Sequence, residues 1–356
     1  MPARLPAAVL PLLCLLSMPA AAQDVADGVA AGDPAPPAGV DSTATPVRPP
    51  FDEWLAGVRA EALERGISVR TLDAALTGLE PQPMVVQRDR TQAEFTFTLD
   101  GYVRRRLTPA LVRDTRRAYA RERRLLGRVS RAYGVPETII AAIWALESNL
   151  GRFSGVRPTV QALATLAWDG RREAFFRREL LDALLIVDRG DIELDSLKGS
   201  WAGAMGQPQF MPSSYLRFAQ DFDGDGRKDI WTSKPDVFAS IAAYLKENGW
   251  SGRYRWGREV RLPADRSALD RAAPLRVEGC SAKRGMTIPL PLSRWHALGV
   301  RRVDGARLPS ASLDASLVRS ETRSFLVYGN YEAVLAYNCA HAYAMSVGLL
   351  ADRLGR

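Results

Sequence analysis

The chain has 356 residues, of which 48 are lysine or arginine and 40 are aspartate or glutamate, giving a net charge of +8. Its 47% hydrophobic and 25% charged residues are typical of a globular protein and exclude a disordered or a disulfide-dense one. Because the chain has only 2 histidines, 3 cysteines and no C-x-x-C pair, a histidine-rich metal centre and a zinc knuckle are excluded. The basic charge, carried mostly by arginine, suits nucleic acid, an anionic lipid or an anionic polymer equally well.

Residues 1–22 have the composition of a secretory signal peptide. Arg4 is followed by an apolar stretch from Leu5 to Met18, and three alanines then form a small-residue cleavage pattern before Gln23. The alternative is a retained membrane anchor, since the uncharged run reaches 19 residues, although three prolines interrupt it. We therefore expect an exported mature protein without a stable membrane span, which argues against a nucleic-acid partner.

Cleavage of the signal peptide would remove Cys14 and leave two cysteines, Cys280 and Cys339. An even pair in an oxidising compartment favours a disulfide bond between them. The alternative is two buried free thiols, and the sequence alone leaves both open.

A linker and an N-terminal helical lobe follow. Residues 23–50 hold six prolines and no apolar periodicity, which predicts a disordered linker. Residues 51–135 are predicted to form a helical lobe. The first helix is indicated by apolar spacing from Phe51 to Val58 and ends at Gly66, and Ser68 caps the second. A third helix is capped by Thr108 and ends at Gly134.

The helix that begins at Thr108 has an arginine-rich face, made of Arg113, Arg116, Arg117, Arg121, Arg123 and Arg124. One interpretation is a solvated face in which these arginines pair with Asp114 and Glu122. The other is an electrostatic platform for an anionic polymer.

The rest of the chain predicts an α+β fold that is predominantly α-helical. Residues 136–250 look mostly helical, and residues 251–320 contain short β-rich runs such as Arg258–Leu262 and Met286–Leu290, which predict a small β-rich insertion. The helical pattern returns from Glu321, so residues 321–356 are expected to form helices that pack back on the helical lobe and the core.

One carboxylate lies in a helix that is apolar nearly all round. Ile140, Ile143, Trp144 and Glu147 share one stripe of the segment ETIIAAIWALESN, and the opposite positions are apolar too. Burial raises the pKa of a carboxyl group, which lets it act as a general acid on a glycosidic oxygen near neutral pH. The alternative is a structural glutamate neutralised by an arginine such as Arg152.

Three segments decide between these alternatives: Glu147-Ser148-Asn149, the run GSWAGAMGQPQFMPSS from Gly199 to Ser214, and Tyr337-Asn338 with the closing helix. From about Phe51 onward the chain resembles the lytic murein transglycosylases, specifically the membrane-bound lytic transglycosylase B family. The resemblance implies a lysozyme-like catalytic core over 136–250. It also implies that peptidoglycan glycan strands are the substrate. With the signal peptide, this predicts a periplasmic location, with association with the membrane or the cell wall left open.

The resemblance assigns Glu147 as the single catalytic acid and base. It would protonate the oxygen between N-acetylmuramic acid and N-acetylglucosamine and then deprotonate the C6 hydroxyl, closing a 1,6-anhydro ring without water. Most glycosidases use two carboxylates. Three other acids follow in the chain, for which positions on a helix surface fit better: Glu173, Glu179 and Asp182.

Substrate contacts are implied at positions that match the family's motifs. Arg171 and Arg172 match a pair that contacts the muramyl carboxylate or peptide, although a solvated helix start would also explain them. Tyr244 matches a cleft tyrosine. Tyr337 and Asn338 match a Tyr-Asn element that is expected to steady the acid and the charge that develops at C1, although both tyrosines could be core aromatics. The implied set is Ser148, Arg171, Arg172, Ser200, Gln209, Tyr244, Tyr337 and Asn338.

An aspartate-rich loop predicts a structural calcium ion. Its acidic residues stand at places 1, 3, 5 and 9 of a calcium loop, with the turn glycine at place 6. Thr232 occupies the twelfth place, where a standard loop has glutamate, and Asp236 is expected to replace it. The expected ligands are Asp221, Asp223, Asp225, Asp229 and Asp236. The alternative is an empty acidic turn.

The function predicted from these motifs is a lytic transglycosylase, acting as a monomer without an organic cofactor. A complex of cell-wall synthesis or hydrolysis is a further expected partner. Two alternatives remain open: a hydrolytic muramidase that uses the same acid with water, and a peptidoglycan-binding scaffold that has lost catalysis.

Overall fold

The computed structural model describes residues 48–91 and 98–355. The predicted signal peptide and the linker up to residue 47 lie outside the described residues. The helices are α1 (Phe51–Glu64), α2 (Val69–Leu76), α3 (Pro83–Thr91), α4 (Leu99–Arg106), α5 (Pro109–Tyr133), α6 (Glu137–Ser148), α7 (Thr159–Trp168), α8 (Glu173–Asp188), η3 (Leu194–Ser196), α9 (Pro212–Phe218), α10 (Lys234–Glu247), α11 (Ser267–Ala272), α12 (Ser281–Arg284), α13 (Leu292–Ala297), α14 (Gly329–Tyr337) and α15 (His341–Leu354).

The predicted helix ends are confirmed where a cap specifies them. The Ser68 hydroxyl oxygen accepts a hydrogen bond from the Thr71 amide at the start of α2, and Thr108 does the same for the Leu111 amide at the start of α5. The chain leaves α5 through Gly134 in the left-handed conformation, with φ of 74°.

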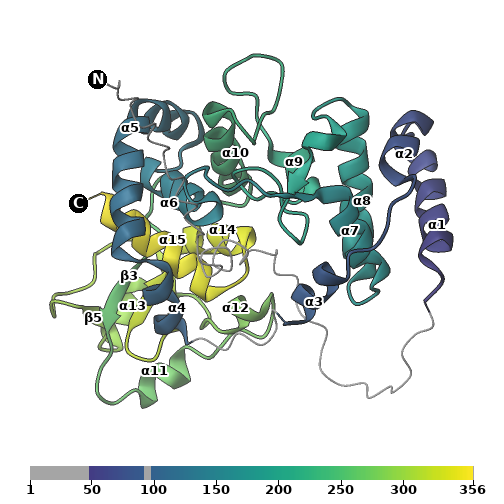
Figure 1. The fold of residues 1–356 in the computed structure, drawn as a ribbon. Helices are drawn as coiled ribbons and strands as arrows, with labels where there is room; N and C mark the ends of the chain where they lie inside the picture. Colours follow the sequence, from purple (N-terminus) through teal and green to yellow (C-terminus); the bar gives the residue numbers. More distant parts are fainter. Residues whose placement is uncertain (1–47, 92–97, 356) are drawn as a thin grey trace, which may run out of the picture.

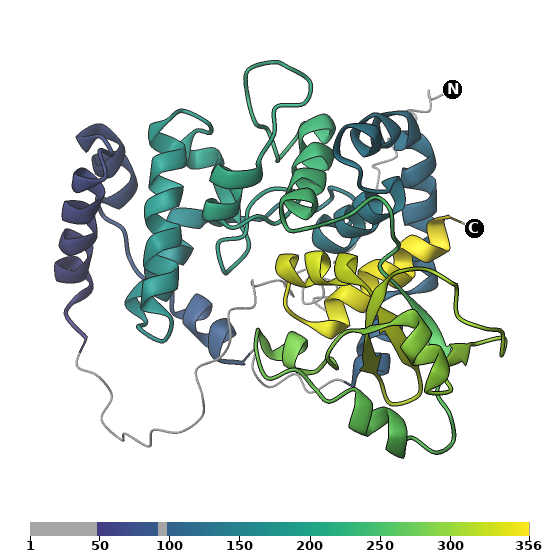
Figure 2. The same cartoon turned by 180° about the vertical axis from the view of Figure 1, so that it is seen from behind.

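Most of the helices share one hydrophobic core that runs from Trp54 to Leu354. Helices α1 and α2 pack on α8, whereas α4 packs on α15 and α5 packs on α6, α10 and α15 (Figures 1 and 2). The segment 51–135 therefore differs from the expected lobe. Helices α1 and α2 pack on each other and on α8, whereas α4 and α5 pack on helices of the other side of the core.

A five-stranded antiparallel sheet has the order β4-β6-β7-β3-β5, and a two-stranded sheet pairs β1 with β2. The strands are β1 (Arg157–Pro158), β2 (Lys198–Gly199), β3 (Gly257–Arg261), β4 (Leu290–Pro291), β5 (Arg301–Arg302), β6 (Asp314–Arg319) and β7 (Ser324–Val327). The larger sheet packs with α11 and α13 around its own small core, in which Trp295 is fully buried.

The expected return of helix at Glu321 is wrong, because β7 occupies residues 324–327 and pairs with both β3 and β6. Helix resumes only at Gly329. A strand of four residues is too short for its periodicity to be told from a helical turn. The β-rich unit therefore extends past residue 320 and includes β7.

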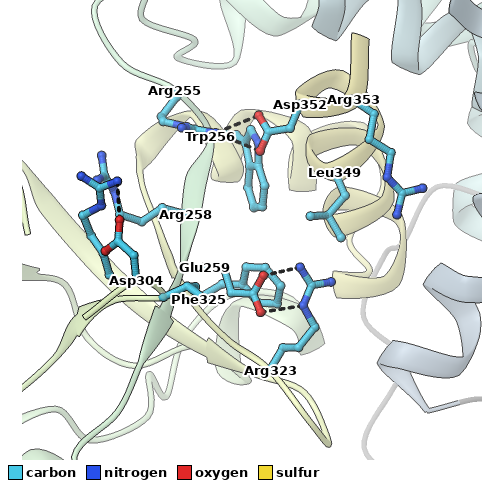
Figure 3. Close-up of a pocket in the computed structure, with 12 residues that line it drawn as sticks. Arg255, Trp256, Arg258, Glu259, Asp304, Arg323, Phe325, Leu349, Asp352 and Arg353 are labelled. Carbon is cyan, nitrogen blue, oxygen red and sulfur yellow. Dashed lines mark hydrogen bonds and ion pairs between the residues drawn. The ribbon is translucent and has the colours of Figure 1, made fainter. Parts of the chain in front are cut away.

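Two tertiary features matter for later sections. A disulfide bond joins Cys280, the N-cap of α12, to Cys339 between α14 and α15. A hollow of about 850 Å³ lies between the sheet and α15, and its ion pairs include Arg255–Asp352 and Arg323–Glu259 (Figure 3). Among the described residues, no single helix is long and apolar enough to cross a membrane, and one pair bent by 117°, α14 with α15, meets that test together.

Candidate active site

Glu147 lies in the last turn of α6, where every residue from Ile139 to Ser148 is buried. Helices α5, α10 and α15 pack around α6 and remove its end from solvent (Figure 1). The side chain of Glu147 is 0% exposed. The burial predicted from the apolar pattern is therefore confirmed.

The two oxygens of this carboxyl group differ. Glu147 Oε1 accepts a hydrogen bond of 2.5 Å from the Tyr343 hydroxyl of α15, whereas Oε2 is buried and has no hydrogen-bond partner among the described residues. Burial raises the pKa of Glu147 to about 8, against the Tyr343 hydrogen bond and the positive charge of Arg106, which both lower it. The group is therefore protonated at neutral pH, with one oxygen available to donate.

Arg152, the arginine named for the structural alternative, pairs with Asp114 instead of Glu147. That guanidinium group lies 3.7 Å from Asp114, and its side chain is 65% exposed. Arg106 of α4 is the arginine whose charge acts on Glu147, and its Nη2 donates to the Leu146 carbonyl oxygen. The positive charge near the acid therefore comes from the N-terminal helices.

An aromatic wall stands beside Glu147. The Tyr337 ring stacks on the Tyr343 ring at 6.3 Å between centroids and lies 4.6 Å from the Tyr244 ring. The hydroxyl groups are both occupied: Tyr337 donates to the Pro208 carbonyl oxygen at 2.7 Å, and Tyr244 to that of Ala336 at 2.6 Å. Tyr337 is buried in the core and Tyr244 is half-buried against it, and both line a hollow of about 30 Å³ together with Gln209.

The glycine-rich turn holds its own polar side chains. Ser200 Oγ accepts from the Ala202 and Ala204 amides, and Gln209 Nε2 donates to the Gly206 carbonyl oxygen at 2.8 Å. Both side chains are buried. In this structure they shape the turn, and Gln209 also faces the small hollow.

One glycine of this turn is required for close packing. Gly203 has a φ of 86°, and a Cβ at that position would lie 2.4 Å from the Leu163 side chain of α7. No other residue type fits both constraints.

Two predicted contacts lie at helix ends. Ser148 Oγ donates to the Trp144 carbonyl oxygen at 2.9 Å and accepts from the Gly151 amide at 3.1 Å, so it closes the turn after α6. Asn338 follows α14 directly and is buried. Both are near neighbours of site residues in the chain, Ser148 beside Glu147 and Asn338 beside Tyr337.

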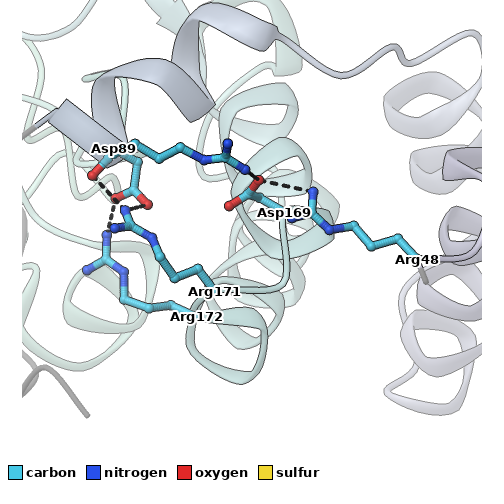
Figure 4. A network of polar contacts seen from close by, with 6 residues as sticks. Arg48, Asp89, Asp169, Arg171 and Arg172 are labelled. Atoms are coloured by element: carbon cyan, nitrogen blue, oxygen red, sulfur yellow. Dashed lines mark hydrogen bonds and ion pairs between the residues drawn. The ribbon is translucent and has the colours of Figure 1, made fainter. Parts of the chain in front are cut away.

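Arg171 and Arg172 belong to a separate ionic network (Figure 4). Both guanidinium groups bind the carboxylate of Asp89 on α3, which is only 5% exposed. Arg48 and Arg90 bind Asp169 in the same network. Both arginines therefore tie α3 to the turn before α8, while the Arg171 side chain stays 43% exposed.

A surface position is wrong for Glu179. Its carboxylate is buried and accepts hydrogen bonds from the Ser213 amide at 2.9 Å and the Ser213 hydroxyl at 2.7 Å. Burial raises the pKa of Glu179, and those bonds lower it. Glu173, by contrast, has a side chain that is 51% exposed. Among the described residues, no carboxylate contributes to the pKa shift of Glu147.

The aspartate loop brings three of its five predicted ligands together. Carboxylate oxygens of Asp221, Asp223 and Asp236 lie within 4.8 Å of one another. Asp225 accepts from the Arg227 amide, and Asp229 from the Trp231 and Thr232 amides. Asp236 does reach the cluster in place of the residue at position twelve, and a set of hard oxygen donors fits calcium.

The family described as "Transglycosylase SLT domain" matches residues 50–352. The chain belongs to this family. Membrane-bound lytic murein transglycosylase B of Escherichia coli is 41% identical over 227 residues, which are 62% of this chain and 58% of that relative. The alignment thus spans less than two thirds of the relative.

Solved structures of relatives support the fold. SltB3 of Pseudomonas aeruginosa, in complex with NAG-anhNAM-pentapeptide, is 42% identical with a TM-score of 0.78, covering 86% of this chain and 79% of that one. Escherichia coli Slt35 in complex with calcium is 26% identical with a TM-score of 0.70, covering 86% of this chain and 93% of that one. The predicted fold class, α+β and mainly helical with a lysozyme-like core, is confirmed.

Two residues that act on Glu147 in this transglycosylase domain, Tyr343 and Arg106, were not predicted from the sequence. Tyr343 stood in the closing helix segment without a role of its own, and Arg106 was one of three consecutive arginines. Nothing local distinguished Arg106.

Proposed function

We propose that this protein is a lytic transglycosylase that cleaves the β-1,4 bond between N-acetylmuramic acid and N-acetylglucosamine in peptidoglycan and leaves 1,6-anhydro ends. The observation that carries the proposal is the state of Glu147: fully buried, with a pKa raised to about 8 and one oxygen without a partner. Membership of the transglycosylase family and the muropeptide bound to SltB3 support it.

In the first step Glu147 acts as the acid. Oε2 donates its proton to the glycosidic oxygen while the bond from that oxygen to C1 of the muramic sugar breaks. Tyr343 keeps its hydrogen bond to Oε1, and Arg106 supplies a positive charge, so the carboxylate that forms is stabilised.

In the second step the same carboxylate acts as the base. It takes the proton of the C6 hydroxyl, whose oxygen forms a new bond to C1. Glu147 thus regains the proton that it gave to the leaving oxygen, and no water is consumed. A single carboxylate suffices for this cycle, in contrast to the two that most glycosidases need.

Tyr343→Phe is expected to slow turnover about 10- to 100-fold, the value of a lost hydrogen bond to a charged group. Because that bond lowers the pKa of Glu147, its loss should also move the alkaline limb of the pH–rate profile upward. The matched control is Tyr337→Phe, whose hydroxyl bonds to Pro208 and not to Glu147. An unchanged limb in Tyr343→Phe, or an equal shift in both variants, would contradict this role.

The two rival functions predict different products. A muramidase would deliver water to C1 and leave reducing ends, and a scaffold would release nothing. Mass spectrometry of digested sacculi separates the three: anhydromuramyl ends support the proposal, whereas ends heavier by one water refute it. A Glu147→Gln preparation provides the blank.

We further propose a periplasmic location for the mature protein, where it would meet peptidoglycan as a monomer or within a wall-remodelling complex. The disulfide between Cys280 and Cys339 supports an oxidising compartment. The signal pattern of residues 1–22 supports export.

We also propose that Asp221, Asp223 and Asp236 hold a structural calcium ion. Asp236 is fully buried yet lies with two other carboxylates, an arrangement that a divalent cation would stabilise. Asp236 also accepts from the Phe222 and Asp229 amides, so it joins both ends of the loop. The ion would hold the loop and take no part in bond cleavage.

Calcium at about 100-fold excess over Kd is expected to raise the free energy of unfolding by about 2–3 kcal/mol and therefore to raise the melting temperature. Asp223→Asn should abolish this shift, because it removes one charged ligand from the cluster. The control is Asp195→Asn, at an exposed aspartate of η3. Differential scanning calorimetry with calcium and with a chelator measures the effect, and an equal shift in Asp223→Asn would rule out this site.

A further inference from the structure

Helix α5 carries a stripe of arginines along its outer face. The stripe consists of Arg113, Arg117, Arg121, Arg124, Arg128 and Arg131, at steps of three or four residues, with Arg116 and Arg123 beside it. All eight side chains are exposed. At 1.5 Å per residue the stripe is about 27 Å long, and at 3.6 residues per turn the eight arginines span about 160° of the helix circumference.

Only one of the two acids expected to neutralise this face pairs with an arginine of the stripe. Asp114 pairs with Arg117, but Glu122 pairs with Lys234 of α10. Within the residues that the structure describes, Arg117 is the one member of the eight that forms an ion pair with a carboxylate. The solvated, internally paired face predicted as one interpretation therefore does not account for the charge.

The hollow between the sheet and α15 shows what a compensated surface looks like (Figure 3). Three of its five arginines are matched by acids, in the pairs Arg255–Asp352, Arg302–Asp304 and Arg323–Glu259. The stripe has no such set. Arg116 donates to the Arg353 carbonyl oxygen of α15, and Arg128 lies over the Phe222 ring. These contacts do not neutralise charge, and like charges three and four residues apart destabilise a helix, so the unpaired charge of the stripe is a cost to α5.

The stripe faces away from the acid. The opposite side of α5, with Val112, Thr115, Ala118, Leu126 and Val129, is buried. That side packs on α6, which carries Glu147, and on α10 and α15 (Figure 1). A ligand on the stripe therefore meets the protein on the side of α5 that faces away from α6 and its carboxyl group.

We propose that the arginine stripe of α5 is a second binding surface for peptidoglycan, which holds the carboxylates of peptide stems outside the catalytic site. The inference rests on the proposed function, because that function supplies an anionic, peptide-bearing polymer as the substrate. Arginine suits carboxylates because its planar guanidinium group binds them in a bidentate manner. Attachment here would keep the enzyme on the insoluble wall between cuts.

The shape of the stripe favours a flexible polymer over a flat bilayer. A plane touches only the crest of a helix, whereas arginines spread over about 160° can be reached by stems that wrap around it. The apolar side of α5 is already buried in the core, so the helix has no face left to insert into lipid. The test must therefore distinguish binding of peptidoglycan from binding of an anionic membrane.

The test compares two variants in a Glu147→Gln background, which prevents digestion during binding. The stripe variant carries Arg113→Gln, Arg117→Gln, Arg121→Gln and Arg124→Gln. The control carries four neutralised arginines that are exposed on the β-rich unit, namely Arg261→Gln, Arg266→Gln, Arg271→Gln and Arg294→Gln. Both lose the same charge, and neither touches a residue of the active site.

Co-sedimentation with purified sacculi is expected to be at least about tenfold weaker for the stripe variant, from four lost exposed ion pairs, and its salt dependence should be shallower. The control should bind like the parent. With Glu147 restored, the stripe variant should cleave short soluble glycan fragments at the parent rate and sacculi more slowly.

Equal sedimentation of the stripe variant and the parent would overturn the proposal. So would a stripe variant that keeps its wall binding but loses binding to vesicles of phosphatidylglycerol and phosphatidylethanolamine, because the surface would then belong to a membrane. Failure of the proposed function is distinguishable, since it would appear in the reaction products and not in the binding of the inactive protein.

Discussion

Glu147→Gln is expected to reduce turnover about 1,000-fold or more, because it removes the proton donor of the first step and the base of the second. The protein should remain folded, since glutamine has nearly the same shape and its amide oxygen can still accept from Tyr343. Rates on purified glycan strands, with circular dichroism as a check of folding, measure this result. Residual activity close to that of the parent would contradict the assignment of the acid.

The same variant should be more stable than the parent, and increasingly so as the pH rises. Burial raises the pKa of Glu147 from 4.5 to about 8, so the folded state favours the protonated form. The stability that protonated Glu147 contributes is fully present below pH 4.5. It is lost as the pH rises from 4.5 to 8, because the glutamate ionises in the unfolded chain but not in the folded one. Glutamine does not titrate, so its advantage should grow over this range to about 4 kcal/mol.

Glu179→Gln is the matched control for this effect. Glu179 is also buried with a raised pKa, but both of its oxygens accept hydrogen bonds from Ser213. Its replacement should lower stability, because an amide group cannot accept both bonds, and should leave the rate per folded molecule near that of the parent. A gain in stability at Glu147 that does not vary with pH would contradict the raised pKa.

Removal of the disulfide with Cys280→Ser and Cys339→Ser is expected to destabilise the protein by about 4 kcal/mol. The two cysteines are 59 residues apart, and a cross-link that closes a loop of this length restricts the unfolded chain by about that amount. Thermal melts with and without a reductant measure the effect. The parent should lose stability in reductant, and the double variant should not respond.

This bond should also affect activity, because Cys339 lies in the short segment between Tyr337 of α14 and Tyr343 of α15. Those rings stack on each other, and Tyr343 holds the acid. We expect turnover to fall with loss of the bond even below the melting temperature. A reductant that leaves both the melting temperature and the rate unchanged would show that the bond is not formed.

Local patterns predicted the features that depend on local forces. The caps at Ser68 and Thr108 are specified within one turn, and the burial of Glu147 follows from the apolar residues on its own helix. The approach of Asp236 to Asp221 and Asp223 was also predictable, because it lies only a few positions beyond the loop and the resemblance implied it.

Partners distant in the chain were not predictable in this way. Tyr343 is 196 residues from Glu147, and Asp89 is 82 residues from Arg171, so no periodicity links them. Strand β7 was missed because its four residues gain their identity from pairing with β3 and β6. The buried position of Glu179 depends on Ser213, which comes from a different helix.

The most direct test of the central claim is digestion of peptidoglycan in water enriched in heavy oxygen, followed by mass spectrometry of the new glycan ends. If Glu147 passes the C6 proton as proposed, the anhydromuramyl ends should contain no heavy oxygen. If water attacks C1 instead, every new end should be a reducing one with a single heavy oxygen. That second result would contradict the account.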